Sequence, residues 1–98
     1  MLNRFAVVPV FAFGMITAAN ACGPGTVELV QRVAKMEKAP LYKCGPEFND
    51  MLVFVQKHEW KAALAAYEAH LGGLGKWEAG SDSANETIAF LRQKVAAP

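Results

Sequence analysis

The chain begins with an apolar run that is too short to cross a membrane and is followed at once by small residues. Arg4 carries the only charge in residues 1–21, and residues 5–19 are almost entirely apolar. A basic start, about 15 apolar residues and small residues three and one positions before a cleavage site make up a secretory signal. A spanning helix needs about 20 apolar residues. We therefore predict a signal peptide over 1–21, cleaved between Ala21 and Cys22; a retained anchor and a core helix are the alternatives.

Residues 22–98 would then form the mature protein, which is short enough to be a single domain. A domain of this size buries little more than about 60 % of its unfolded surface, so its core alone gives marginal stability. Without Arg4, nine Lys and Arg balance nine Asp and Glu. This balance argues against nucleic-acid binding, because that requires many cationic side chains to neutralise phosphates.

Both cysteines of the chain begin the same tripeptide, Cys-Gly-Pro, at residues 22–24 and 44–46. An exported protein reaches an oxidising compartment, so a Cys22–Cys44 disulfide is predicted. Closing a loop of about 22 residues would stabilise the fold by roughly 3 kcal/mol. A redox Cys-Gly-Pro-Cys motif is excluded, because Gly25 and Glu47 occupy the fourth positions.

An alternative follows from the place of Cys22 directly after the predicted cleavage site. The chain would then be an outer-membrane lipoprotein, anchored through a lipid on Cys22 and acting as an assembly accessory. The preceding Ala19 and Asn20 depart from the usual lipobox, which has Leu, a small residue and then Gly or Ala. Lipidation would also consume the only cysteine other than Cys44, and the disulfide is therefore the leading interpretation.

The spacing of apolar residues predicts an all-α fold, a small three- to four-helix bundle stapled by one disulfide. Thr26 is the expected N-cap of the first helix, and Ser83 with Glu86 the expected capping box of the last. Gly72 and Gly73 are expected to end the third helix in a left-handed cap. The predicted helices cover about residues 26–38, 47–57, 59–71 and 83–96.

Residues 47–71 contain no Gly or Pro, yet their apolar residues change face along the segment. The first stripe consists of Phe48, Met51, Leu52 and Val55. The second stripe consists of Trp60, Leu64, Tyr67 and Leu71. At 100° per residue the two stripes differ by roughly 140°. A break near residues 57–59 would turn both stripes toward one core.

The sequence offers no convincing catalytic or metal site. His58-Glu59 begins like a zinc-protease helix, but Ala62 stands where the second His is required. His58 and His70 lie about 120° apart on an ideal helix, so they are interpreted as ordinary surface or half-buried side chains. We expect no catalytic residue, no metal ligand and no cofactor, and hence a protein that is not an enzyme.

Trp77 is the leading candidate for contact with a partner. It lies in a predicted loop, residues 74–82, between Gly75 and Gly80. Trp is favoured at binding hot spots, so a projecting Trp77 would anchor a partner, whereas folding back over the core is the more common arrangement. Leu74 and Trp60 are weaker candidates for the same surface.

The predicted function is that of a small exported protein, periplasmic or secreted, which binds rather than catalyses. Its partner would be a protein or a small apolar ligand. No membrane association is expected after signal cleavage unless Cys22 is lipidated.

Overall fold

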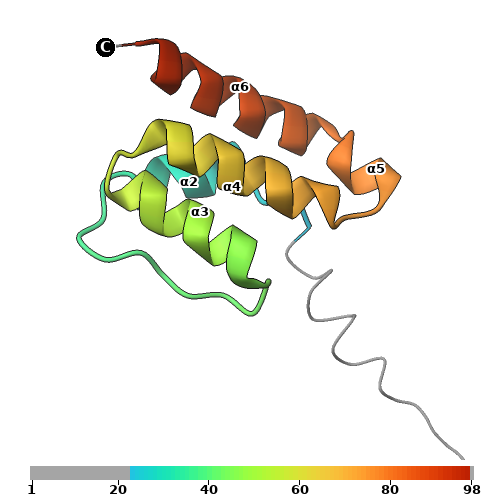
Figure 1. Cartoon of the computed structure of the whole chain (residues 1–98), viewed down its shortest axis with the longest axis horizontal. Coiled ribbons are helices and arrows are strands. Elements are labelled where there is room, and N and C mark those ends of the chain that lie inside the picture. The colour runs from blue at the N-terminus through green and yellow to red at the C-terminus, as the bar shows by residue number, and fades with distance from the viewer. Residues whose placement is uncertain (1–22, 98) are drawn as a thin grey trace, which may run out of the picture.

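The described chain is built from helices that pack around one core. The computed structural model describes residues 23–97, in which helices follow one another and no strand occurs. The all-α prediction is confirmed for these residues. The predicted signal peptide, its cleavage site and Cys22 lie outside the described residues. The helices are α2 (Val27–Val33), α3 (Pro46–Gln56), α4 (Trp60–Gly72), α5 (Lys76–Ala79) and α6 (Asp82–Ala96) (Figure 1).

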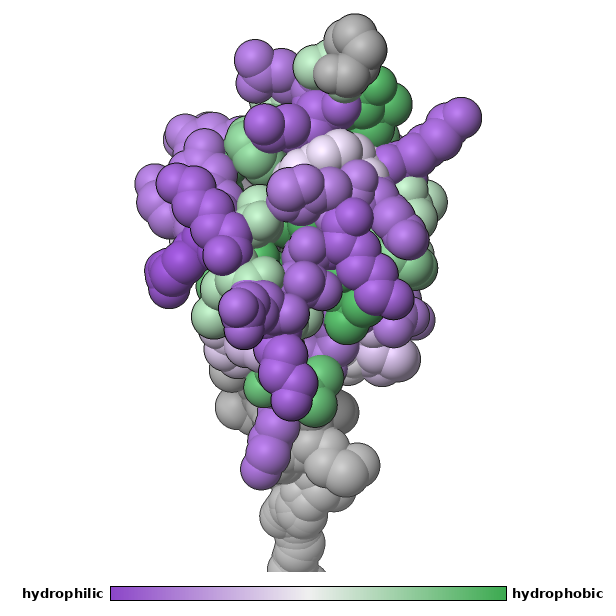
Figure 2. All heavy atoms as spheres, turned by 90° about the vertical axis from the view of Figure 1, so that its left-hand side faces the viewer, coloured by the Kyte–Doolittle hydropathy of each residue, from purple (hydrophilic) through white to green (hydrophobic). Residues whose placement is uncertain are grey.

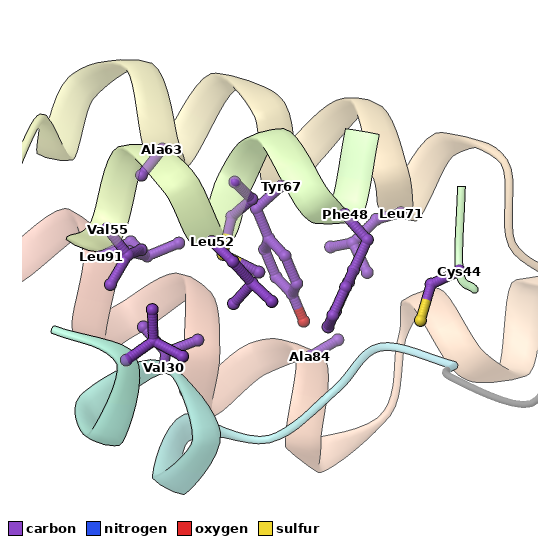
Figure 3. Close-up of a cluster of buried hydrophobic side chains, with 12 residues drawn as sticks. Val30, Cys44, Phe48, Leu52, Val55, Ala63, Tyr67, Leu71, Ala84 and Leu91 are labelled. Carbon is purple, nitrogen blue, oxygen red and sulfur yellow. The ribbon is translucent and has the colours of Figure 1, made fainter. Parts of the chain in front are cut away.

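Helix α4 lies at the centre of this arrangement. It packs against α3 on one side and against α6 on the other, and both neighbours run antiparallel to it (Figure 1). Helix α2 contacts both α3 and α6 and so closes the core. Figure 3 shows side chains of several helices meeting between these elements. The buried apolar residues are Val30, Val33, Cys44, Phe48, Met51, Leu52, Val55, Ala63, Tyr67, Leu71, Ala84 and Leu91.

Helix α2 is shorter than predicted, since it ends at Val33 instead of continuing to residue 38. Beyond it, two carbonyls accept hydrogen bonds from side chains at the end of α3. His58 Nε2 donates to Ala34 O at 2.8 Å, and Gln56 Nε2 donates to Met36 O at 3.3 Å. These tertiary partners replace the next helical turn. The connector then runs back beside α3, which brings the starts of α2 and α3 to the same end of the molecule (Figure 1).

The predicted break between the second and third helices is confirmed. His58 has φ 60, the left-handed conformation. The N–H of Glu59 donates to the carbonyl of Phe54 at 2.8 Å, and the N–H of His58 donates to that of Val55 at 2.9 Å. This pair of bonds is the Schellman motif, which usually places Gly at the left-handed position. The chain turns sharply there, and α4 packs back on α3.

The two predicted apolar stripes differ in how completely they are buried. All four predicted residues of α3 are buried. In α4 the buried set is Ala63, Tyr67, His70 and Leu71, whereas Trp60 and Leu64 are only half-buried. Because α4 packs between α3 and α6, its buried face is broader than, and rotated from, the stripe of large apolar residues. In α6, similarly, Thr87 is buried while Val95 is 39 % exposed.

Two predicted helix ends are wrong. Gly73 has φ −92, so it is not a left-handed cap. Ser81, not Ser83, caps α6: its Oγ accepts from the N–H of Ala84 at 3.2 Å. The hydroxyl of Ser81 also donates to Glu78 O at 2.8 Å. Ser81 therefore joins α6 to α5, a short helix that forms inside the predicted loop. At the other end of the chain Thr26 is the N-cap of α2, as predicted.

Candidate binding site

Trp77 projects from the surface. Its side chain is 89 % exposed, so the alternative in which it folds back over the core is wrong. The backbone beneath it is helical: the N–H groups of Ala79 and Gly80 donate to the carbonyls of Gly75 and Lys76 at 2.9 and 3.1 Å. An exposed indole thus stands on a hydrogen-bonded turn.

The remaining contacts of α5 hold it against the bundle. Ala79 packs on the core and Glu78 is half-buried. The Oε2 atom of Glu78 lies 3.5 Å from the point where a Cβ on Gly23 would be. These contacts leave Lys76 and Trp77 directed outward, both of them exposed.

The structure does not gather the three predicted partner-binding residues on one surface. Leu74 is half-buried and packs against the core beside α5. Trp60 begins α4, a helix of 13 residues that spans about 20 Å, whereas Trp77 follows its far end. Trp77 and Trp60 therefore belong to opposite ends of the bundle (Figure 1).

A buried cluster at the C-terminal end of α4 holds the first described residues. The hydroxyl of Tyr67 donates to Pro24 O, and Nε2 of His70 donates to Gly23 O at 2.7 Å. The ring of Phe48 meets that of His70 edge-on, with centroids 4.9 Å apart. We name this group of five residues the N-terminal clamp. The expectation that His70 is a surface or half-buried side chain is wrong, since it is 6 % exposed.

The clamp has a chemical signature at Tyr67, which is fully buried. Burial raises the pKa of the Tyr67 hydroxyl, and a hydrogen bond with Thr87 opposes this shift. The hydroxyl therefore stays protonated over the ordinary pH range and remains a donor to the Pro24 carbonyl.

A pocket of about 470 Å³ opens at the other end of α4. In it the ring of His58 stacks on Trp60, with centroids 5.3 Å apart and planes 23° apart. The ring of Phe90 meets Trp60 edge-on at 6.0 Å. Figure 2 looks at this end of the molecule, where hydrophilic side chains predominate and apolar surface shows between them. The lining residues are Gln31, Ala34, Lys35, His58, Trp60, Phe90 and Lys94.

Sequence reasoning missed this pocket. The sequence carries one signal for the pocket: Phe90 lies off the main apolar stripe of α6, and Lys94 follows Phe90 by one turn. The contribution of His58 depends on the left-handed turn before α4, and no residue pattern marked that turn as part of a site.

Within residues 23–97, no three His, Cys, Asp or Glu side chains gather where a metal ion would bind. His58 and His70 lie near opposite ends of α4. None of the helices described has the length and apolarity needed to cross a bilayer.

Comparison with known proteins finds no relative of this chain. The chain matches no protein-family model, and no curated protein or solved structure shows significant similarity to it.

Proposed function

We propose that this chain is an exported, non-enzymatic binding protein that captures a protein partner by inserting Trp77 into an apolar pocket of that partner. The observation that carries the proposal is the 89 % exposure of an indole on a hydrogen-bonded helix. An aromatic side chain buries 150–250 Å² in an interface, which at about 25 cal/mol per Å² corresponds to roughly 4–6 kcal/mol before association costs. An exposed Trp of this kind has the properties of a binding hot spot.

Export is supported by the tripartite pattern of residues 1–21, and the predicted Cys22–Cys44 disulfide by the geometry beside it. Cys44 is 5 % exposed, and it lines one small cavity together with Gly25 and Phe48. In Figure 3 its sulfur points toward the beginning of the described chain. The clamp fixes the carbonyl of Gly23, the residue next to Cys22, near the same place. A bridge would then covalently reinforce the clamp.

The lipoprotein anchored through Cys22 makes a different prediction, which one measurement separates. The intact mass of the exported protein, recorded before and after reduction and thiol alkylation, should correspond to residues 22–98 less two hydrogens. Reduction should then expose two thiols to the alkylating agent. A mass higher by several hundred daltons would establish lipidation and reject the bridge. A mass that retains residues 1–21 would reject export by signal cleavage.

The role of Trp77 is tested by photo-crosslinking in the cells that produce the protein. A photoreactive amino acid replaces Lys76, which is exposed beside Trp77, in one variant and Leu41, which is 80 % exposed, in a matched variant. We expect position 76 to give a discrete crosslinked band and position 41 to give none. Unlabelled wild-type protein, added as a competitor, should weaken the band at least tenfold. Trp77→Ala, added in the same way, should leave the band unchanged. Equal competition by both proteins would remove Trp77 from the binding surface.

Folding must be unchanged for this test to be decisive. Trp77 contacts little of the bundle, so Trp77→Ala should alter the free energy of unfolding by no more than about 0.5 kcal/mol. Urea unfolding followed by circular dichroism measures this change.

A further inference from the structure

The pocket at the N-terminal end of α4 has the features of a ligand site, and it is separate from the proposed Trp77 surface. We propose that it binds a small planar aromatic carboxylate. Its volume of about 470 Å³ falls within the range of small-molecule sites, roughly 300–1,000 Å³. Three separate segments form its wall: α2 with the turn after it, the corner between α3 and α4, and α6.

The aromatic walls suit a planar apolar ligand. Trp60 and Phe90 are half-buried and meet edge-on, which leaves part of each ring open to the pocket. The Nζ atom of Lys94 lies over both rings, 5.7 Å from the centroid of Trp60 and 5.6 Å from that of Phe90. A ligand ring can take the place of the ammonium group over these side chains, while Lys94 turns to meet the ligand's charge.

The charges in the pocket favour an anion. Lys35 and Lys94 line it, and no Asp or Glu is among the lining residues. The ion pair found in the described chain joins Arg92 to Glu68 at 3.7 Å, and neither residue lines the pocket. Two ammonium groups beside low-dielectric aromatic walls attract a carboxylate more strongly than they would on an open surface.

The backbone of His58 gives a second, independent observation. A non-glycine residue at φ 60 costs about 1 kcal/mol or more, and such strain collects at functional sites. Glycine would satisfy the turn with less strain. Histidine instead supplies a ring that donates to Ala34 O and stacks on Trp60, and so forms one wall of the pocket.

The test uses the two tryptophans of the chain as internal reporters. In the ¹⁵N-labelled protein, the indole N–H resonances of Trp60 and Trp77 are followed while 2-naphthoate is added. We expect a saturable shift of the Trp60 signal and no shift of the Trp77 signal. The neutral 2-naphthamide and the non-planar cyclohexanecarboxylate should each bind at least tenfold more weakly than 2-naphthoate.

Matched lysine variants test the charge requirement. The double variant K35Q/K94Q should bind 2-naphthoate at least tenfold more weakly, whereas K43Q/K76Q, which removes two exposed lysines outside the pocket, should bind it like the wild type. Dispersed backbone amide spectra of both variants establish that they fold.

Three outcomes would overturn the proposal. In the first, the Trp60 signal does not saturate at millimolar naphthoate. In the second, naphthamide binds as tightly as naphthoate. In the third, both lysine pairs weaken binding equally. Trp77→Ala should leave the titration unchanged. The test of this site is therefore independent of the proposed partner surface.

Discussion

The two ends of α4 use similar side chains to opposite effect. At the C-terminal end, Tyr67 and His70 are buried, and each has a polar atom hydrogen-bonded to a backbone carbonyl. At the N-terminal end, His58 and Trp60 stack on each other at the mouth of a pocket. Where polar atoms are buried and paired, an aromatic cluster fixes the chain; where rings and cations stay accessible, a similar cluster can receive a ligand.

The C-terminal, clamped end of α4 and its N-terminal, open end also differ in backbone conformation. At the clamped end a glycine, Gly25, takes the left-handed conformation, and a Cβ there would lie 3.0 Å from the ring of Phe48. At the open end a histidine takes it. The clamped end therefore combines close packing with low strain, whereas the open end retains strain and leaves space.

The largest test of this comparison removes one Phe from each end. Phe48→Ala should lower the free energy of unfolding by about 3–5 kcal/mol, because Phe48 is 2 % exposed and its loss leaves a cavity. Phe90→Ala should cost about 1 kcal/mol, because Phe90 is half-buried at the pocket. Urea unfolding of the two variants gives both values. Equal losses would show that the open end is as tightly packed as the clamped end.

Reduction should weaken the clamped end next. If the mature protein carries the Cys22–Cys44 bridge, reduction removes the restraint on a loop of about 22 residues and costs roughly 3 kcal/mol. The measurement compares urea midpoints with and without reductant. An unchanged midpoint in a protein with the mass of residues 22–98 would show that the clamp holds without covalent help.

Tyr67→Phe should cost about 1–2 kcal/mol, because the Pro24 carbonyl loses its donor. The substitution should also change the response to alkali. Since burial raises the folded-state pKa of Tyr67, its contribution is complete below the unfolded value of about 10 and declines as pH rises through the folded-state pKa. Wild-type stability should therefore fall above about pH 10, and Tyr67→Phe should fall less. The free energy of unfolding is measured for both proteins from about pH 8 to about pH 12. If the two stability curves run parallel over this range, groups other than Tyr67 cause the alkaline loss of stability.

The smallest expected effect isolates the strain at the open end. His58→Gly and His58→Ala both remove the imidazole, but only glycine relieves the left-handed backbone, so the glycine variant should be more stable by about 1 kcal/mol. Thermal unfolding of the pair measures this difference. Identical stabilities would mean that the turn relaxes when the ring is absent.

Much of the bundle could be predicted, because apolar spacing directly reports which face of a helix is buried. The stripe of α3 and the break before α4 are as predicted. The stripe of α4 is confirmed only in part, because packing between two helices also buries small and polar residues such as Ala63 and His70. Of the candidate site residues, Trp77 projects from the surface, which is one of the two arrangements predicted for it. Trp60 lies at a pocket that the sequence did not reveal.

The sequence by itself determined the all-α class of residues 23–97, since apolar periodicity is a local property of the chain. Only the tertiary structure decided where α2 stops and which side chains hold Gly23 and Pro24. Each of these depends on a polar atom that finds its partner in another helix or loop. Such pairings join residues distant in the chain, and local spacing carries no record of them.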